Sequence, residues 1–187
     1  MLQLLEEIRT CVLCPLPHGH RPVMAAHLKS KIVIIGQAPG RKVHESGVPW
    51  DDKSGDNLRK WLGVTHEQFY DPTLFAILPM GFCYPGTGKS GDLPPRPECA
   101  PQWHSKVLDQ LKETELTLLI GQYAQEYYLQ KSEQSLTETV KNYEAYLPNY
   151  FVLPHPSPRN NIWMKKNPWF GDEVLPALKN RISAAIP

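Results

Sequence analysis

The feature that most constrains the fold is a short apolar run that ends in a proline turn. Residues 32–35 are Ile-Val-Ile-Ile, β-branched throughout, and the turn Gly36-Gln-Ala-Pro-Gly40 follows at once. Such a run is typical of a strand buried on both faces of a parallel sheet. Ligands of open α/β sheets bind at the carboxyl ends of the strands. A plain tight turn is the simpler interpretation of this stretch alone, and a binding loop is the alternative.

Three further apolar segments, at residues 74–78, 116–120 and 150–153, are predicted to be strands. Because they alternate with helical patterns, they indicate an α/β fold with a mostly parallel sheet, and right-handed crossovers would cover both faces with helices. We therefore expect one domain over residues 1–187, in which three α/β/α layers surround a four-stranded central sheet. Residues 41–52 are expected to form an extended loop, and Asp172 is expected to cap the final helix.

Composition restricts the functions that are open to this chain. The 187 residues carry a net charge of only +1, so any contact with nucleic acid must be local. No apolar run is long enough to span a membrane, and the amino terminus lacks the apolar core of a signal peptide. A cytoplasmic protein is therefore expected, and a single domain of near-neutral charge suggests a monomer.

The four cysteines fall into two pairs. Cys11 and Cys14 are separated by two residues, whereas Cys83 and Cys99 are separated by fifteen within a loop rich in proline and glycine. A CxxC pair lets two thiolates reach one metal, and so long a loop needs something to hold it. We expect a metal site, and spacing leaves zinc and an iron–sulfur cluster open, since both accept four thiolates. The alternative is four thiols that pack as small apolar side chains.

Four segments together carry a resemblance to a known family. They are Glu7–Cys14, Gly36–Gly40, the second cysteine pair with Pro94–Cys99, and His155-Pro-Ser-Pro158. In this order they resemble the iron–sulfur class, family four, of the uracil-DNA glycosylase superfamily. The resemblance implies a four-stranded parallel sheet between helices and a [4Fe-4S] cluster, rather than zinc, on the four cysteines. It also implies excision of uracil or another deaminated base from DNA, as in base-excision repair.

The resemblance also implies roles for single residues. A glycosylase must take a base out of the stack into a pocket, and breaking the N-glycosidic bond leaves negative charge on that base. His155 would donate to the base oxygen where this charge develops. Trp50 would stack on the flipped base, and Gly36, Gln37 and Ala38 would line the pocket with their backbone.

Contacts to DNA are implied for the residues that follow the histidine motif. Ser157 would hold phosphate, and Arg159 and Asn160 stand where the family inserts residues into the duplex. Further phosphate contacts could come from basic side chains elsewhere in the chain, namely Arg41, Lys42, Lys53, Lys89, Lys165 and Lys166.

Three positions depart from the family's pattern. Ala38 replaces an aspartate that orients the attacking water in active relatives, Gln37 replaces a glutamate, and Pro79 replaces an asparagine that reads the uracil edge. Water activation would then fall to Gln37, or to Glu45, Asp51 or Asp52 of the neighbouring loop, or be weak. The alternative function is a catalytically weak or inactive iron–sulfur DNA-binding protein on the same scaffold, and a third interpretation is an iron–sulfur redox protein.

Overall fold

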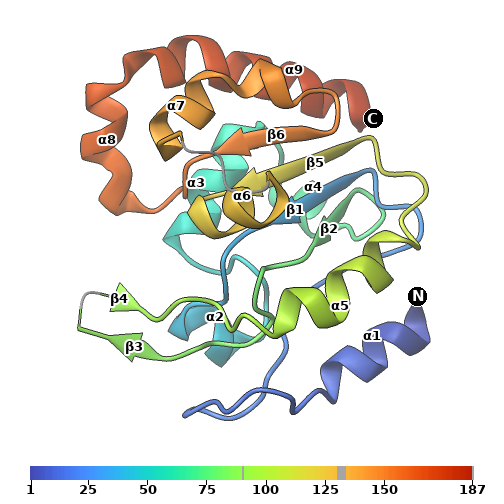
Figure 1. Cartoon of the computed structure of the whole chain (residues 1–187). Coiled ribbons are helices and arrows are strands. Elements are labelled where there is room, and N and C mark those ends of the chain that lie inside the picture. Colours follow the sequence, from blue (N-terminus) through green and yellow to red (C-terminus); the bar gives the residue numbers. More distant parts are fainter. Residues whose placement is uncertain (90, 130–133, 187) are drawn as a thin grey trace.

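A four-stranded parallel sheet forms the centre of the protein (Figure 1). The structure is a computed structural model that describes residues 1–89, 91–129 and 134–186. The strands of the sheet are β1 (Ile32–Ile35), β2 (Phe75–Ile77), β5 (Leu116–Ile120) and β6 (Tyr150–Leu153), in the order β2-β1-β5-β6. In the register, Val33 lies opposite Ala76 on one side and Thr117 on the other. The predicted fold class and the four predicted strands are confirmed.

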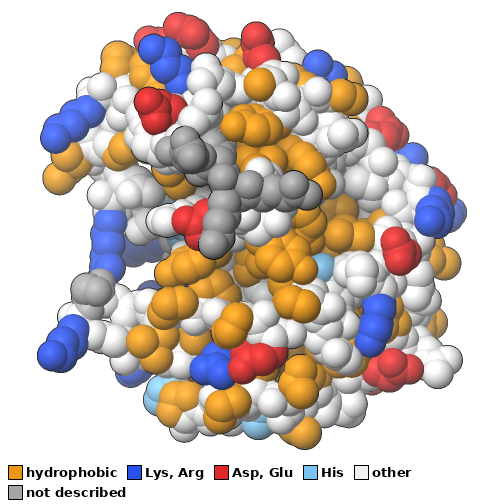
Figure 2. Space-filling model, in the orientation of Figure 1, with side chains coloured by type: hydrophobic (Ala, Val, Ile, Leu, Met, Phe, Trp, Pro, Cys, Tyr) orange, Lys and Arg blue, Asp and Glu red, His pale blue; other side chains and the backbone are white. Residues whose placement is uncertain are grey.

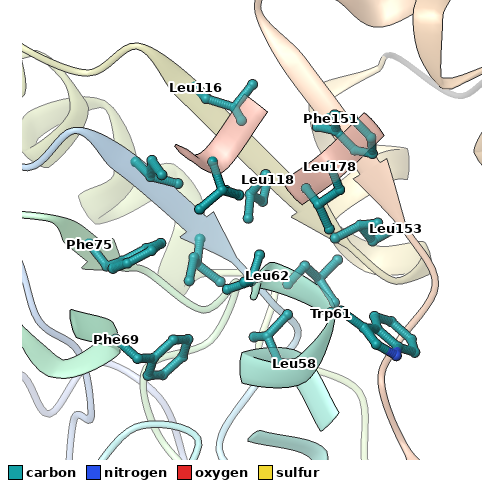
Figure 3. Close-up of a cluster of buried hydrophobic side chains, with 14 of the residues drawn as sticks. Leu58, Trp61, Leu62, Phe69, Phe75, Leu116, Leu118, Phe151, Leu153 and Leu178 are labelled. Carbon is teal, nitrogen blue, oxygen red and sulfur yellow. The ribbon is translucent and has the colours of Figure 1, made fainter. Parts of the chain in front are cut away.

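Helices cover both faces of the sheet because successive strand residues point to opposite sides. One face packs against α3 (Lys53–Leu62), α4 (His66–Tyr70) and α9 (Leu175–Ala185). The buried apolar side chains of the sheet and these helices form one hydrophobic cluster, part of which is drawn in Figure 3. The other face packs against α1 (Leu2–Arg9) and α5 (Cys99–Leu108). Residues 32–35 of β1 contribute alternately to the two clusters, which explains why the whole strand is apolar.

The remaining elements lie mostly around the carboxyl edge of the sheet. They are α2 (Arg41–Ser46), the hairpin of β3 (Thr87–Gly88) and β4 (Gly91–Asp92), α6 (Gln122–Tyr128), α7 (Leu136–Lys141), the 3-10 turns η1 (Tyr143–Tyr146) and η2 (Pro158–Asn160), α8 (Asn161–Lys166), and the π-helix η3 (Phe170–Val174). In Figure 1 the hairpin and α8 project toward the same side of the molecule. In the described part of the chain, no helix has both the length and the apolar character needed to cross a membrane.

Two predictions about local structure are wrong. Residues 41–46 are not extended but form α2, because Val43 is buried and the Gly47 N–H bonds to the Val43 carbonyl oxygen at 2.8 Å. Gly47 has φ 74°, a left-handed conformation that ends a helix at little cost for glycine. Asp172 does not cap the final helix, since it lies inside η3, which continues directly into α9.

A buried histidine joins α5 to the segment that follows β2. His104 Nε2 lies 3.0 Å from the Pro79 carbonyl oxygen, and Nδ1 lies 2.6 Å from the Tyr128 hydroxyl. Because a carbonyl can only accept, Nε2 carries the hydrogen and Nδ1 accepts from Tyr128. Burial lowers the pKa of His104 to about 4, against the opposing effect of the Pro79 carbonyl, so the imidazole is neutral at pH 7.

The free energy of unfolding should therefore depend on pH through His104. Between about pH 6.5 and pH 4 the unfolded chain binds a proton on this side chain that the folded chain does not bind. The stability is thus full above pH 6.5 and falls by about 3 kcal/mol on the way to pH 4. Denaturant titrations across this range should show a smaller loss in His104→Gln than in the unaltered protein, whereas parallel losses would contradict the assignment.

Candidate active site

A cleft of about 600 Å³ lies at the carboxyl ends of the parallel strands. The turn after β1, the segment before α3, the β3–β4 hairpin and the loop after β6 all contribute to its walls. Figure 2 shows a hollow on this side of the molecule, between α8 and the hairpin, with Lys and Arg side chains on its rims. The position agrees with the general rule that open α/β sheets bind ligands at this edge.

The cleft brings together eight of the nine residues that the sequence analysis proposed for catalysis, base binding and DNA contact. These eight are Gly36, Gln37, Ala38, Trp50, His155, Ser157, Arg159 and Asn160. Asp51 is the exception, because it is exposed and lies outside the lining, whereas its neighbour Asp52 is part of it. Asp52 is also the N-cap of α3, with Oδ1 accepting from the Gly55 N–H at 2.9 Å.

The turn after β1 is held by the segment that follows β2. The Gly36 carbonyl oxygen accepts from the Met80 N–H, and the Gln37 carbonyl oxygen accepts from the Gly81 N–H, each at 2.9 Å. These bonds continue the pairing of β1 with β2 beyond the ends of both strands. The backbone of the turn is therefore fixed before any ligand arrives, which is what a preorganised binding loop requires.

Trp50 is held in an unusual conformation beside this turn. Its φ is 58°, in the left-handed region that side chains other than glycine rarely adopt. A Cβ on Gly36 would lie 2.8 Å from Trp50 Cζ2, and a Cβ on Gly55 would lie 1.8 Å from the Trp50 carbonyl oxygen. Two glycines thus make room for this one residue. Strain of this kind persists where the surroundings impose it, and it clusters at ligand sites.

The ring of Trp50 stacks on His155, with the ring centroids 5.6 Å apart and an angle of 30° between the planes. Two asparagines donate hydrogen bonds to the backbone of the histidine loop, residues 155–158. Asn160 Nδ2 donates to the His155 carbonyl oxygen at 2.7 Å, and Asn57 Nδ2 donates to the Pro156 carbonyl oxygen at 3.0 Å. Asn160 therefore positions the loop in addition to lining the cleft. Sequence reasoning missed Asn57, because its place on α3 gave no sign of a contact with the histidine motif.

His155 is uncharged at neutral pH. Burial lowers its pKa, and the negative charge of Asp52 opposes this shift only in part. A neutral imidazole that keeps one N–H can donate a hydrogen bond to an oxygen on which negative charge develops. The chemistry that was expected of His155 is thus compatible with its surroundings.

The hairpin adds cleft residues that sequence reasoning did not name. Thr87, Gly91 and Asp92 also line the cleft. The available signal was the length of the proline- and glycine-rich loop at 79–98, since long loops in compact domains are often functional. Pro79 also lines the cleft, and its carbonyl oxygen is taken by His104.

A second, smaller cavity is lined by all four cysteines: Cys11, Cys14, Cys83 and Cys99. It lies between the amino-terminal segment, the loop after β2 and the start of α5, so the chain brings its two distant cysteine pairs together. Among residues 1–89, 91–129 and 134–186, no group of three or more His, Cys, Asp or Glu side chains is arranged to hold a single metal ion.

Backbone donors point at two of the sulfur atoms. The Phe82 nitrogen lies 3.3 Å from Cys99 Sγ, and the backbone N–H of Arg21 lowers the pKa of the Cys83 thiol. Burial raises the pKa of Cys83 to about 11 and that of Cys99 to about 12, and these N–H groups act against the shift. N–H groups directed at sulfur, together with a buried position, are the surroundings that tune iron–sulfur clusters. The residues present fit such a group.

A substitution at Gly55 tests whether Trp50 needs the space that a glycine leaves beside it. Gly55→Ala should lower the free energy of unfolding by about 2 kcal/mol, because the new Cβ overlaps backbone atoms that cannot move aside without shifting α3. Gly171→Ala is the matched control, since nothing lies within 4 Å of its added Cβ. That variant should be neutral or up to about 1 kcal/mol more stable. Equal stabilities of the two variants would show that Trp50 does not need this space.

The model of the Uracil DNA glycosylase superfamily matches residues 24–179, which is most of the chain. The match includes both loops of the cleft and the second cysteine pair, while Cys11 and Cys14 lie before it. The superfamily part of the sequence resemblance is thereby confirmed, and the chain belongs to the uracil DNA glycosylase superfamily.

Proposed function

We propose that this protein is a DNA glycosylase that hydrolyses the N-glycosidic bond of uracil, or of another deaminated base, in DNA. One observation carries the proposal: the stacked pair of Trp50 and His155 stands in one cleft with the rigid turn of residues 36–38. An aromatic face, a neutral donor and a fixed backbone are the parts that an extruded base needs.

The roles follow from where charge moves in the reaction. As the glycosidic bond breaks, the electron pair stays with the base and its oxygen becomes negative. The His155 N–H donates to that oxygen, and a donor of this kind contributes on the order of 100-fold or more to the rate. Trp50 offers its face to the base, where stacking contributes about 1–3 kcal/mol.

Basic side chains near the cleft would hold the DNA backbone. Arg159 lines the cleft, and Lys165 and Lys166 end the adjoining helix α8. With a net charge of only +1 on the whole chain, this local group accounts for binding better than a general attraction does. Ser157 caps η2 by accepting from the Arg159 N–H at 3.3 Å, so its hydroxyl also helps to place Arg159.

A second candidate function is that of a binding protein with weak or no catalysis. Ala38 brings no polar atom of its side chain to the cleft, and the Pro79 carbonyl oxygen is already bonded to His104. At these two positions, therefore, the side chains can neither orient a water molecule nor read a base edge. An active enzyme must draw these functions from other residues of the cleft.

Base release from labelled oligonucleotides distinguishes the two functions. The substrates carry one uracil, hypoxanthine or xanthine, and each is tested single-stranded and paired. The proposal predicts release of at least one of these bases, and a loss of about 100-fold or more in the single-turnover rate for His155→Ala.

His66→Ala is the matched control, because His66 is exposed on α4 and does not line the cleft. It should leave the rate unchanged. If the unaltered protein binds all these oligonucleotides but releases no base, the binding function replaces the enzymatic one. Equal rates for His155→Ala and the unaltered protein would contradict the role of His155.

We also propose that the four cysteines hold a [4Fe-4S] cluster rather than zinc. The support is the shared cavity and the groups around it, which include Arg96, whose positive charge acts against the raised pKa of the Cys14 thiol. In this place the cluster would have a structural role, since it would pin the amino-terminal segment to the loop after β2 and to the start of α5. The roles proposed for His155 and Trp50 do not depend on electron transfer.

Purification without oxygen tests the cluster. We expect a brown protein whose broad visible absorbance bleaches on reduction, with iron and sulfide near four of each per chain. Cys99→Ser should lose this absorbance and melt at a lower temperature. A colourless protein with one zinc per chain would contradict the proposal, because zinc has no redox chemistry.

A further inference from the structure

The β3–β4 hairpin lines the cleft and lies beside both of its main loops, the turn after β1 and the loop after β6. A Cβ on Gly40 would lie 3.3 Å from Asp92 Oδ2, so this carboxylate stands against the turn that follows β1. A Cβ on Gly91 would lie 3.1 Å from Arg159 Nη1, so the residue before Asp92 lies close to the loop that follows β6. Asp92 is thereby placed between the two loops that form the proposed base pocket.

Asp92 is also the carboxylate of the cleft that has no structural task. Within the described residues, the lining contains two carboxylates, Asp52 and Asp92. Asp52 caps α3, and it faces the backbone of Gly55. No hydrogen bond to the Asp92 carboxylate occurs in the described part of the chain, and its side chain is exposed toward the cleft. A group in this position is free to contact a bound molecule.

The charges around Asp92 suit a group that must be ionised and yet bind a proton. Partial burial raises the pKa of Asp92, the positive charges of Arg159 and Arg41 lower it, and the negative charge of Asp52 raises it again. A carboxylate so placed would repel a DNA phosphate. It suits the opposite partner, a centre that becomes positive, or a water molecule that must lose a proton.

We propose that Asp92 is a catalytic residue that orients the attacking water and stabilises the positive sugar. It would take over the function that the side chain at position 38 does not supply in this chain. This inference rests on the glycosylase function proposed above and extends it to a residue of the hairpin.

The step balances as a hydrolysis. The bond between C1′ and the base nitrogen breaks, and its electron pair leaves with the base, whose oxygen accepts the hydrogen bond from His155. The water oxygen forms a bond to C1′ from the other face of the sugar while one of its protons passes to the Asp92 carboxylate. That proton is then released to solvent, and the departed base takes up one proton from solvent. No oxidant or further reactant is required.

Single-turnover kinetics on a labelled oligonucleotide with one uracil tests the inference. Asp92→Asn should slow release by about 100-fold, the usual contribution of general base catalysis. Its dissociation constant for the same DNA should stay within twofold or become smaller, because a negative charge near the phosphates has been removed. Asp92→Glu keeps the carboxylate and should recover part of the rate.

Asp109→Asn is the matched control, because Asp109 is exposed at the end of α5, outside the cleft. It should release uracil at the rate of the unaltered protein. If the unaltered protein releases uracil and Asp92→Asn does so at the same rate, the inference fails while the proposed function stands. A loss of rate matched by an equal loss of DNA binding would also overturn it. If the unaltered protein releases no base at all, the proposed function itself fails.

Discussion

The site depends on the packing of one tryptophan against two glycines. Trp50 can lie over Gly36 and stack on His155 only because neither Gly36 nor Gly55 has a Cβ. The contact joins three segments that are far apart in the sequence: the turn after β1, the start of α3 and the loop after β6. It also obliges Trp50 to keep a left-handed backbone. The cleft is therefore built as a unit, and a change in one of its walls must move the others.

The parallel sheet explains why the cleft lies where it does. All four strands end at the same edge, so the loops after β1 and β6 emerge close together although β5 lies between their strands. Amide side chains then fix the loop after β6. Gln125 Nε2 donates to the Leu153 carbonyl oxygen at 2.9 Å at the end of β6, and Asn57 and Asn160 bind the carbonyl oxygens just beyond it. The packed apolar layers thus hold the strands in place, and a few amide hydrogen bonds fix the position of the loop.

The strands and the two cleft loops could be predicted from the sequence because each has a local signal. A short continuous apolar run bounded by turn residues is typical of a buried strand, and the motifs at residues 36–40 and 155–158 each follow such a run closely. The errors concern places where tertiary contacts decide. One buried side chain, Val43, turns a polar segment into α2. Asp52, and not Asp51, lies in the cleft because Asp52 is the residue that caps α3, and this depends on where the helix begins.

The position of Asp92 in the cleft could not be predicted from a local sequence signal. Asp92 has no motif, and only the fold brings it against Gly40, more than fifty positions earlier in the chain. If the cleft receives an extruded base, a crystal structure of His155→Ala with an oligonucleotide that carries one uracil should show this base out of the stack. The base should lie on the ring of Trp50, beside residues 36–38, with Asp92 facing the sugar. DNA bound across another face, or a uracil still stacked in the strand, would contradict the assignment of this cleft.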